Sequence, residues 1–157
     1  MRSGFVTTAG AFVAATLAAS LVLGMGGCQN NVDDTDIKYI TSGDVKQMLE
    51  TRATKPDHVL LVDPRSAREF AEGHIAGAEH ITIDRVSEEK SPRNPPFGRY
   101  THIVVYGNDP ASPPAKGMAK RIMGLGFKKN TRMYQGGMQD WASTYPSLVE
   151  RAEDAPK

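Results

Sequence analysis

Hydrophobic residues fall along the chain in short runs, which alternate with longer segments whose apolar positions recur every three or four residues. The run "HVLLVD" (58–63) is typical of a strand that is covered on both faces. Similar short runs predict four further strands, at 37–41, 79–83, 102–106 and 131–135. Because strands that alternate with helices favour parallel pairing, we expect an α/β fold with an open, mostly parallel five-stranded sheet and helices on both faces.

The segments between these strands have helical periodicity and helix end signals. Ser42 is expected to cap the first helix. Ser66 and Glu69 have the spacing of a capping box at the start of a second helix. A third helix is expected over 115–125, and Gly126 suits its C-terminal end.

The last helix is expected to follow the Gly136-Gly137 turn and to end before Pro146. Met118 and Met138 lie on apolar helix faces, so we interpret them as core residues. The segment 85–100 carries three prolines and clustered charges, and it predicts an exposed loop.

The N-terminal residues 1–27 form a separate unit. Arg2 precedes a stretch of 24 residues without a charge (4–27), an arrangement typical of a secretory signal. The sole cysteine, Cys28, follows small residues, and this junction resembles the lipobox of bacterial lipoproteins, in which diacylglycerol alkylates the thiol. An uncleaved membrane anchor and an ordinary cleaved signal are the alternatives. All three predict export.

The resulting domain organisation has four parts. Residues 1–27 are a lipoprotein signal peptide, 28–36 a polar tether, 37–146 the folded domain and 147–157 a polar C-terminal tail. We expect the exported chain to be anchored in the membrane of the bacterial cell envelope through a lipid on Cys28.

Charge and histidine spacing exclude two classes of function. Beyond residue 27 the chain has 18 basic and 18 acidic residues, and no basic run is longer than "KK" at 128–129. Bulk charge therefore gives no reason to expect nucleic-acid binding. His58, His80 and His102 lack ligand spacing with one another or with a cysteine, so we expect no metal and no cofactor.

Two motifs resemble those of rhodanese-like domains. The first is "LLVDPRSAREFAEGHIAGAEHI" (60–81), in which the family positions include Asp63, Arg65, Glu69, Gly73, His74 and Gly77. The second comprises "VVY" (104–106), "LGF" (125–127) and "YQGGMQDW" (134–141). The resemblance covers roughly residues 38–145 and implies the rhodanese-like fold for the domain at 37–146.

The motif residues also have structural roles that need no catalysis. Asp63 and Arg65, at the end of a strand, can hydrogen-bond each other and the loop backbone. Gly73 and Gly77 are expected to allow tight turns. We interpret His74 as a neutral, buried polar residue and not as a metal ligand.

Rhodanese-like sulfurtransferases carry a cysteine directly after the strand that corresponds to 102–106, and its thiolate holds sulfur as a persulfide. The resemblance places Gly107 at that position, and Cys28 lies outside the domain. Related phosphatases of this fold use a cysteine and an arginine, and 107–115 contains neither. Asp109 would repel an incoming anion. Three prolines in this loop also lack an N–H group that could bind an anion.

We therefore expect no catalytic residue in the loop around Gly107, Asn108, Asp109 and Ser112. The sequence predicts a catalytically inactive rhodanese-like domain that acts as a binding or regulatory module with an unidentified protein partner. One alternative is an enzyme with non-cysteine chemistry in the 107–115 loop, with Ser112 or Asp109 as nucleophile or base. Another is a remnant with a purely structural role.

Overall fold

The computed structural model describes residue 4, residues 32–88 and residues 90–152. The predicted signal peptide, apart from residue 4, and the predicted lipidation site Cys28 lie outside the described residues. Within the described ranges, no helix is both long enough and apolar enough to cross a membrane.

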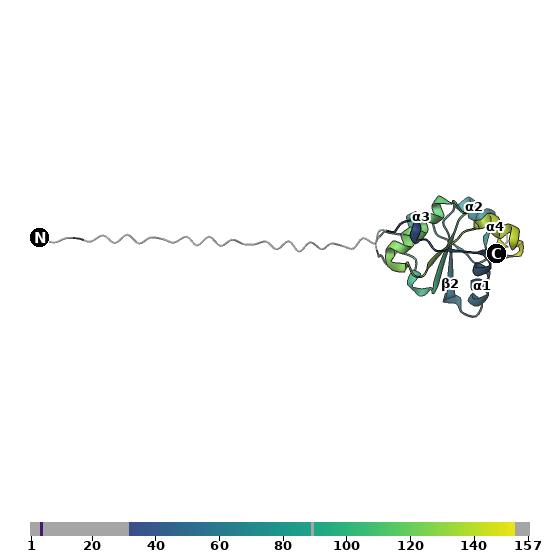
Figure 1. The fold of residues 1–157 in the computed structure, drawn as a ribbon, viewed down its shortest axis with the longest axis horizontal. Coiled ribbons are helices and arrows are strands. Elements are labelled where there is room, and N and C mark those ends of the chain that lie inside the picture. Colours follow the sequence, from purple (N-terminus) through teal and green to yellow (C-terminus); the bar gives the residue numbers. More distant parts are fainter. Residues whose placement is uncertain (1–3, 5–31, 89, 153–157) are drawn as a thin grey trace.

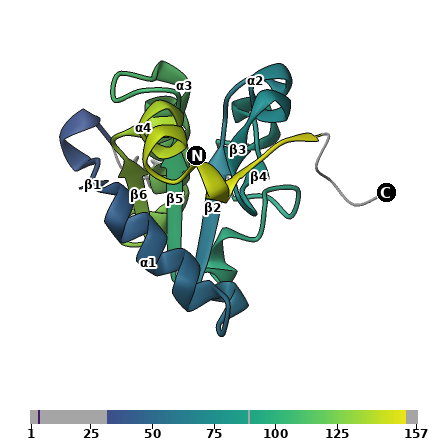
Figure 2. The ribbon, with the colours of Figure 1, turned by 90° about the vertical axis from the view of Figure 1, so that its right-hand side faces the viewer.

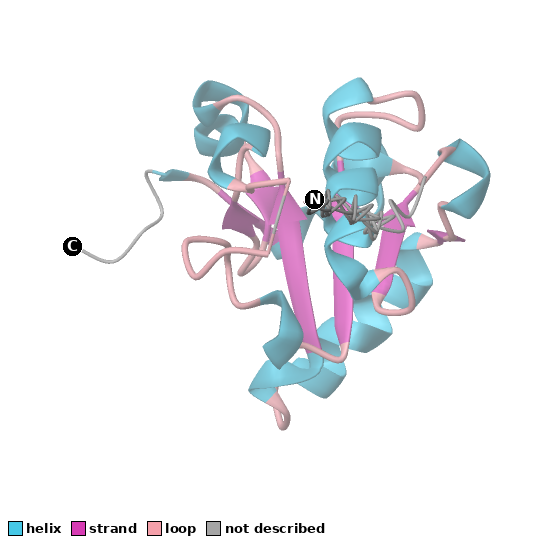
Figure 3. Ribbon diagram, turned by 90° about the vertical axis from the view of Figure 1, so that its left-hand side faces the viewer, coloured by secondary structure: helices cyan, strands magenta, loops and turns pink. Residues whose placement is uncertain are grey.

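A parallel five-stranded sheet forms the centre of the domain (Figure 1 and Figure 3). The strands lie in the order β1-β6-β5-β2-β4, and each neighbouring pair is parallel. Their bounds are β1 (Tyr39–Ile40), β2 (Val59–Asp63), β4 (Glu79–His80), β5 (His102–Tyr106) and β6 (Thr131–Tyr134). The predicted mostly parallel five-stranded sheet is confirmed.

Helices cover both faces of this sheet. The α-helices are α1 (Ser42–Arg52), α2 (Ala67–Glu72), α3 (Pro113–Ile122) and α4 (Gly137–Thr144). Figure 2 shows α1 and α4 in front of the sheet. The π-helical turn η5 (Met123–Phe127) continues α3, and Gly126 within it has a φ of 102°. Short 3₁₀ turns complete the fold: η1 (Asp34–Asp36), η2 (Pro56–His58), η3 (Ile83–Arg85), η4 (Phe97–Arg99) and η6 (Pro146–Leu148).

The alternation of side chains along β5 divides the core into two layers. Ile103 and Val105 pack with Met118 of α3 on one face. Val104 and Tyr106 pack with Trp141 of α4 on the other. Successive side chains of a strand point to opposite faces, so one strand supplies both layers. The interpretation of Met118 and Met138 as core residues is confirmed, because both are buried.

Two local predictions are wrong. Thr41, not Ser42, is the N-cap of α1, because the Thr41 side chain accepts a hydrogen bond from the N–H of Asp44 and Ser42 is already helical. The segment 85–100 is not a wholly exposed loop, since Val86 and Phe97 near its ends are each 1% exposed and join the core. Apolar side chains bury themselves even where prolines and charges dominate their neighbourhood.

The folded part of the chain extends further than the sequence indicated at both ends. In the predicted tether, residues 34–36 form η1, and Val32 packs against the core. In the predicted tail, β7 (Val149–Glu150) pairs antiparallel with β3 (His74–Ile75). The indole N–H of Trp141 donates to the Leu148 carbonyl at 3.1 Å, which helps to hold this C-terminal segment against the domain.

Candidate functional site

The candidate site lies at the carboxyl ends of β2 and β5, which are neighbours in the sheet. Asp63 ends β2, and the loop that begins with Gly107 follows β5. In open α/β sheets the loops at this edge commonly bind ligands. The N-terminus of α4 also reaches this edge, because the Met138 N–H donates to the Gly107 carbonyl at 2.8 Å.

Asp63 and Arg65 form a buried ion pair. The Arg65 Nε donates to Asp63 Oδ1 at 2.9 Å, and its Nη2 donates to Asp63 Oδ2 at 2.6 Å. The same Nη2 donates to the Gly73 carbonyl at 2.7 Å. Burial acts to lower the pKa of the guanidinium, but the hydrogen bond and the charge of Asp63 outweigh it and raise the pKa above its usual value. The expected mutual contact of Asp63 and Arg65 is therefore present.

Asn108 bridges Arg65 and Glu69. Arg65 Nη1 donates to Asn108 Oδ1 at 2.8 Å, and Asn108 Nδ2 donates to Glu69 Oε1. The other oxygen of Glu69 accepts from the Ser66 hydroxyl at 2.6 Å and from its N–H at 3.0 Å, as the predicted capping box requires. These hydrogen bonds, those from Ser66 first, lower the pKa of Glu69. Asn108 thus occupies the space between a guanidinium and a carboxylate.

The side chain of Ser112 fills the space above Gly107. A Cβ atom built on Gly107 would lie 2.1 Å from Ser112 Oγ and 2.2 Å from Ser112 Cβ. Ser112 itself is 7% exposed. No larger residue therefore fits at 107 in this conformation of the loop.

The backbone of the loop is bonded to α4. The Gly107 and Asn108 carbonyls accept from the N–H groups of Met138 at 2.8 Å and Gln139 at 3.0 Å. The approach is close, because a Cβ on Gly137 would lie 2.6 Å from the Asn108 carbonyl carbon, and Gly137 has a φ of 65°. Two N–H groups in the first turn of α4 are thus used within the protein instead of facing a ligand.

Asp109 forms a local turn in the same loop. Its Oδ1 accepts from the Ala111 N–H at 2.8 Å. Such a side-chain-to-backbone bond is typical of turns initiated by aspartate.

Tyr106 belongs to the site although its sequence context gave little sign of this. Its hydroxyl accepts from the Ile75 N–H at 3.2 Å, and the Arg65 guanidinium lies 5.7 Å from its ring centroid. Burial, followed by the charge of Asp63, raises the pKa of Tyr106 well above its ordinary value. Tyr106 looked like an ordinary strand residue; the available signal was that a buried tyrosine hydroxyl needs a hydrogen-bond partner.

The remaining motif residues, His74, Gly77 and Gly73, have structural roles. His74 is buried, its Nδ1 lies 2.9 Å from the Phe70 carbonyl, and its Nε2 lies 3.5 Å from Glu150 Oε2. Gly77 has a φ of 68°, as a tight turn requires. Gly73 does not serve a turn of that kind: its φ of 164° is extended, and a Cβ there would meet Val149 Cγ1 at 3.3 Å.

An open cleft of about 390 Å³ lies beside Asn108. Its walls come from α2, α4 and the C-terminal segment, with the residues Arg65, Glu69, Glu72, Gly73, Asn108, Met138, Gln139, Ala142, Val149 and Arg151. Ser112 is not among them. The cleft therefore exposes Asn108 and the edge of the motif, while the space above Gly107 is closed.

No group of three or more His, Cys, Asp or Glu residues within the described ranges is placed to hold a metal ion. The structure does bring His58 and His102 together, with ring centroids 4.8 Å apart, although 44 positions separate them in the sequence. His102 begins β5, so this pair lies at the amino ends of the strands, whereas the candidate site lies at their carboxyl ends.

Comparison with known proteins gives consistent matches for this domain. Residues 41–144 match the family model of the rhodanese-like domain. The thiosulfate sulfurtransferase GlpE of Pseudomonas putida is 35% identical over 103 residues, which cover 65% of this chain and 84% of the relative.

Two solved structures resemble the domain as well. One is a protein of unknown function from Rhodopseudomonas palustris, described as a possible tyrosine phosphatase, with 25% identity, a TM-score of 0.54 and coverage of 69% of this chain and 82% of that chain. The other is an uncharacterized protein from Saccharomyces cerevisiae, with 21% identity, a TM-score of 0.57 and coverage of 70% and 94%. The second likeness is one of fold alone.

Proposed function

The chain belongs to the family of rhodanese-like domains, and we propose that it is a member without sulfurtransferase activity, anchored in the cell envelope through Cys28 and acting as a binding or regulatory module. Because the chain is homologous to sulfurtransferases, sulfur transfer is the chemistry with which its site must be compared. That chemistry needs a thiolate directly after β5 to hold sulfur as a persulfide.

The observation that carries this proposal is the packing of Ser112 over Gly107. Glycine supplies no nucleophile, and the 2.1 Å between a built Cβ and Ser112 Oγ leaves no room for one. The only cysteine of the chain is Cys28, which lies before the region that matches the family. A covalent sulfur intermediate therefore has no thiol in the domain on which to form.

The bonding of the loop supports the same conclusion. The guanidinium of Arg65 is engaged by Asp63, Gly73 and Asn108. Two N–H groups of α4 are bonded to loop carbonyls. An incoming anion would have to displace these contacts, and breaking a buried charge-assisted hydrogen bond is costly.

Envelope anchoring is supported by the sequence of the N-terminal unit. Arg2, the 24 uncharged residues 4–27 and the small residues before Cys28 form the pattern of a lipoprotein signal. Two acyl chains on one cysteine give stable membrane attachment. Mass spectrometry of the native N-terminus tests this part: a diacylglycerol-modified Cys28 supports it, and an N-terminus at another residue contradicts it.

A binding role is supported by the exposed parts of the same region. Pro110, Pro113 and Pro114 are exposed in a loop whose base is fixed by Asn108 and Ser112. A rigid, proline-containing surface loses little conformational entropy when a protein partner binds. Replacing these three prolines with serine should weaken crosslinking of the partner in native envelopes, and unchanged crosslinking would exclude the loop as the contact.

The alternative is an enzyme that uses Ser112 or Asp109. Against it, Ser112 is buried and Asp109 bonds its own loop backbone. The discriminating experiment uses the detergent-solubilised chain with Cys28→Ser, assayed for thiosulfate:cyanide sulfurtransferase and for phosphomonoesterase activity, with Pseudomonas putida GlpE as the sulfurtransferase control. We expect buffer rates in both assays. Phosphatase turnover would favour the alternative, and thiocyanate formation would overturn the proposal.

A further inference from the structure

The segment before β1 is docked on the domain by charge. Lys120 Nζ of α3 lies 2.7 Å from Asp34 Oδ1, and Lys128 Nζ, directly after η5, lies 2.6 Å from Asp36 Oδ1. Ile37 is buried in the core, and Asp33 caps η1 by accepting from the Thr35 N–H at 2.8 Å. The segment 34–37 is therefore held against α3 and η5.

Docking shortens the connection to the proposed lipid. Only four residue steps separate Cys28 from Val32, which packs against the core. At about 3.3–3.6 Å for each extended residue, this connection spans at most about 14 Å. We call the side of the domain on which residues 34–37 contact α3 and η5 the docked end. A lipid on Cys28 would hold the docked end close to the bilayer.

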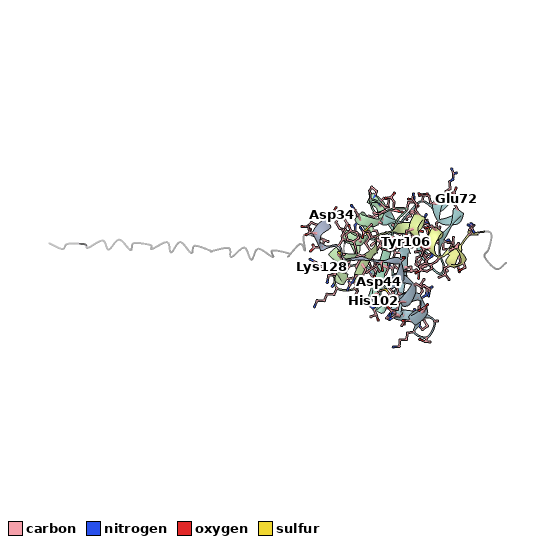
Figure 4. The ribbon with its side chains drawn as sticks, turned by 45° about the vertical axis from the view of Figure 1, so that its right-hand side comes forward. Asp34, Asp44, Glu72, His102, Tyr106 and Lys128 are labelled. Atoms are coloured by element: carbon pink, nitrogen blue, oxygen red, sulfur yellow. The ribbon has the colours of Figure 1, made fainter. Side chains whose placement is uncertain are left out.

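The docked end is opposite to the cleft beside Asn108. Figure 4 shows Asp34 and Lys128 at one end of the domain and Glu72, which lines the cleft, at the other. An anchor at the docked end would therefore direct the cleft away from the membrane.

The segment against which residues 34–37 dock is basic in sequence. Residues 116–132, which run through α3 and η5 into β6, contain six basic residues and no acidic residue: Lys116, Lys120, Arg121, Lys128, Lys129 and Arg132. Asp34, Asp36 and Glu88 pair with three of them. Lys129 is exposed beside Lys128, and a Cβ on Gly126 would lie 3.9 Å from the Nζ of the exposed Lys90. Lysines near a membrane surface are attracted to anionic lipids.

An apolar hollow lies beside Lys90. Its volume is about 400 Å³, and its walls include Pro92, Pro95, Pro96 and Phe127, with Lys90 at its side; Phe97, which also lines it, is itself buried in the core. Phe127 directly precedes Lys128 and is only half-buried. Apolar side chains flanked by lysines are the combination that binds the interface of a bilayer, because the apolar groups enter the headgroup boundary while the lysines contact phosphate.

We propose that this end of the domain, formed by η5, the 90–98 loop and the docked segment 34–37, lies against anionic lipid headgroups, so that the candidate-site cleft faces away from the bilayer. We call it the membrane-facing end. The inference rests on the proposed lipid anchor at Cys28 and adds an orientation and a lipid chemistry to it.

The test uses the full lipid-modified chain, purified from membranes and reconstituted into vesicles of phosphatidylcholine with phosphatidylglycerol. A fluorophore is attached to a cysteine introduced as Lys129→Cys or as Glu72→Cys, and quenching by a headgroup-linked spin label is measured. We expect severalfold stronger quenching at 129 than at 72, and a smaller ratio in vesicles of phosphatidylcholine alone. Equal quenching, or stronger quenching at 72, would overturn the orientation.

A double substitution without new positive side chains tests the role of docking. Asp34→Ala with Asp36→Ala removes both ion pairs, and the quenching ratio should fall towards one. The matched control, Glu50→Ala with Asp57→Ala, makes the same charge change at exposed positions that pair with Lys46 and Arg99. The control should keep the ratio. An unchanged ratio in the Asp34 and Asp36 variant, or a loss of the ratio in the control alone, would contradict the role of docking.

The outcomes separate this inference from the proposed function. A chain that does not float with vesicles overturns both the anchor and the orientation. A chain that floats with equal quenching at the two positions overturns the orientation alone. Thiocyanate formation overturns catalytic inactivity and leaves the quenching ratio unaffected.

Discussion

The guanidinium of Arg65 donates a 2.8 Å hydrogen bond to the side-chain oxygen of Asn108, 43 positions later in the chain. The Nδ2 of Asn108 in turn donates a hydrogen bond to Glu69 Oε1. The loop after β5 is thereby joined to the motif after β2 by an uncharged amide that separates two opposite charges. The same loop holds Ser112 over Gly107, so the bonds that order the loop also close the position of the family's nucleophile.

Removing Arg65 should destabilise the domain strongly. In Arg65→Leu the carboxylate of Asp63, which is 0% exposed, loses its ionic partner. Breaking a buried ion pair costs about 3–5 kcal/mol, so the free energy of unfolding in urea should fall by that amount. The control is Arg68→Leu, which removes the exposed pair with Glu72 and should change the free energy of unfolding little. Equal effects of the two substitutions would contradict the importance of the buried network.

Restoring a cysteine at 107 should not restore activity. In Gly107→Cys the new Cβ would meet Ser112 at 2.1–2.2 Å, so the loop must move. We expect a loss of about 1–3 kcal/mol in the free energy of unfolding, typical of overpacking, and no thiocyanate formation. Thermal unfolding and the sulfurtransferase assay measure the two effects.

Two further variants check the cause of that loss. Gly124→Cys is the matched control, because a Cβ at that position has no atom within 4 Å, and its stability should change little. Adding Ser112→Gly to Gly107→Cys should recover part of the lost stability, since residues in direct contact have non-additive effects. A fully additive double variant would show that Ser112 is not the obstacle.

The capping box of α2 should make a pH-dependent contribution to stability. Hydrogen bonds from Ser66 and then Asn108 lower the pKa of Glu69 in the folded state. A lowered pKa gives stability that is present above the unfolded value, about 4.3, and is lost as the pH falls through the folded value. Ser66→Ala should therefore cost about 1 kcal/mol at pH 7 and less at pH 3.

Ser143→Ala is the control for this pH dependence. The Ser143 hydroxyl donates to the Asp140 carbonyl and not to a carboxylate, so the cost of its removal should not vary with pH. Urea unfolding at both pH values measures each difference. A cost of Ser66→Ala that stays constant from pH 7 to pH 3 would exclude the linkage to Glu69.

The C-terminal segment should be part of the cooperative unit. A chain that ends after Pro146 loses β7 and the carbonyl of Leu148 that accepts from Trp141, which is 0% exposed. A buried donor without a partner costs about 1–3 kcal/mol, and the apolar contacts of Val149 are lost in addition. The melting temperature should fall in this chain and should be unchanged in a chain that ends after Ala152.

The sequence predicted the sheet well because continuous apolar runs and parallel strands are both consequences of burial on two faces. It located Asp63, Arg65 and Glu69 because their spacing is local and carries a capping signal. It did not reveal the bridge through Asn108, since Arg65 and Asn108 meet only when β2 and β5 pair in the sheet. A side chain that joins two loops leaves no periodic pattern in the chain.

The ends of the domain were misjudged for a related reason. Asp34 and Asp36 have the composition of a solvated tether, but lysines more than 80 positions away neutralise them. Val149 and Glu150 have the composition of a polar tail, but they form a strand because they pair with β3. The composition of a segment does not show which distant residues it contacts. Contacts between residues far apart in the sequence therefore cannot be predicted from it.

Transfer of sulfur to the protein itself tests the central claim most directly. The chain with Cys28→Ser is incubated with thiosulfate labelled in its outer sulfur and analysed for protein-bound label, beside Pseudomonas putida GlpE as the control. With Gly107 in place of a thiol, the chain should retain no label under conditions that load the control. Label bound within residues 37–150 and released by cyanide would contradict a domain that works by binding alone.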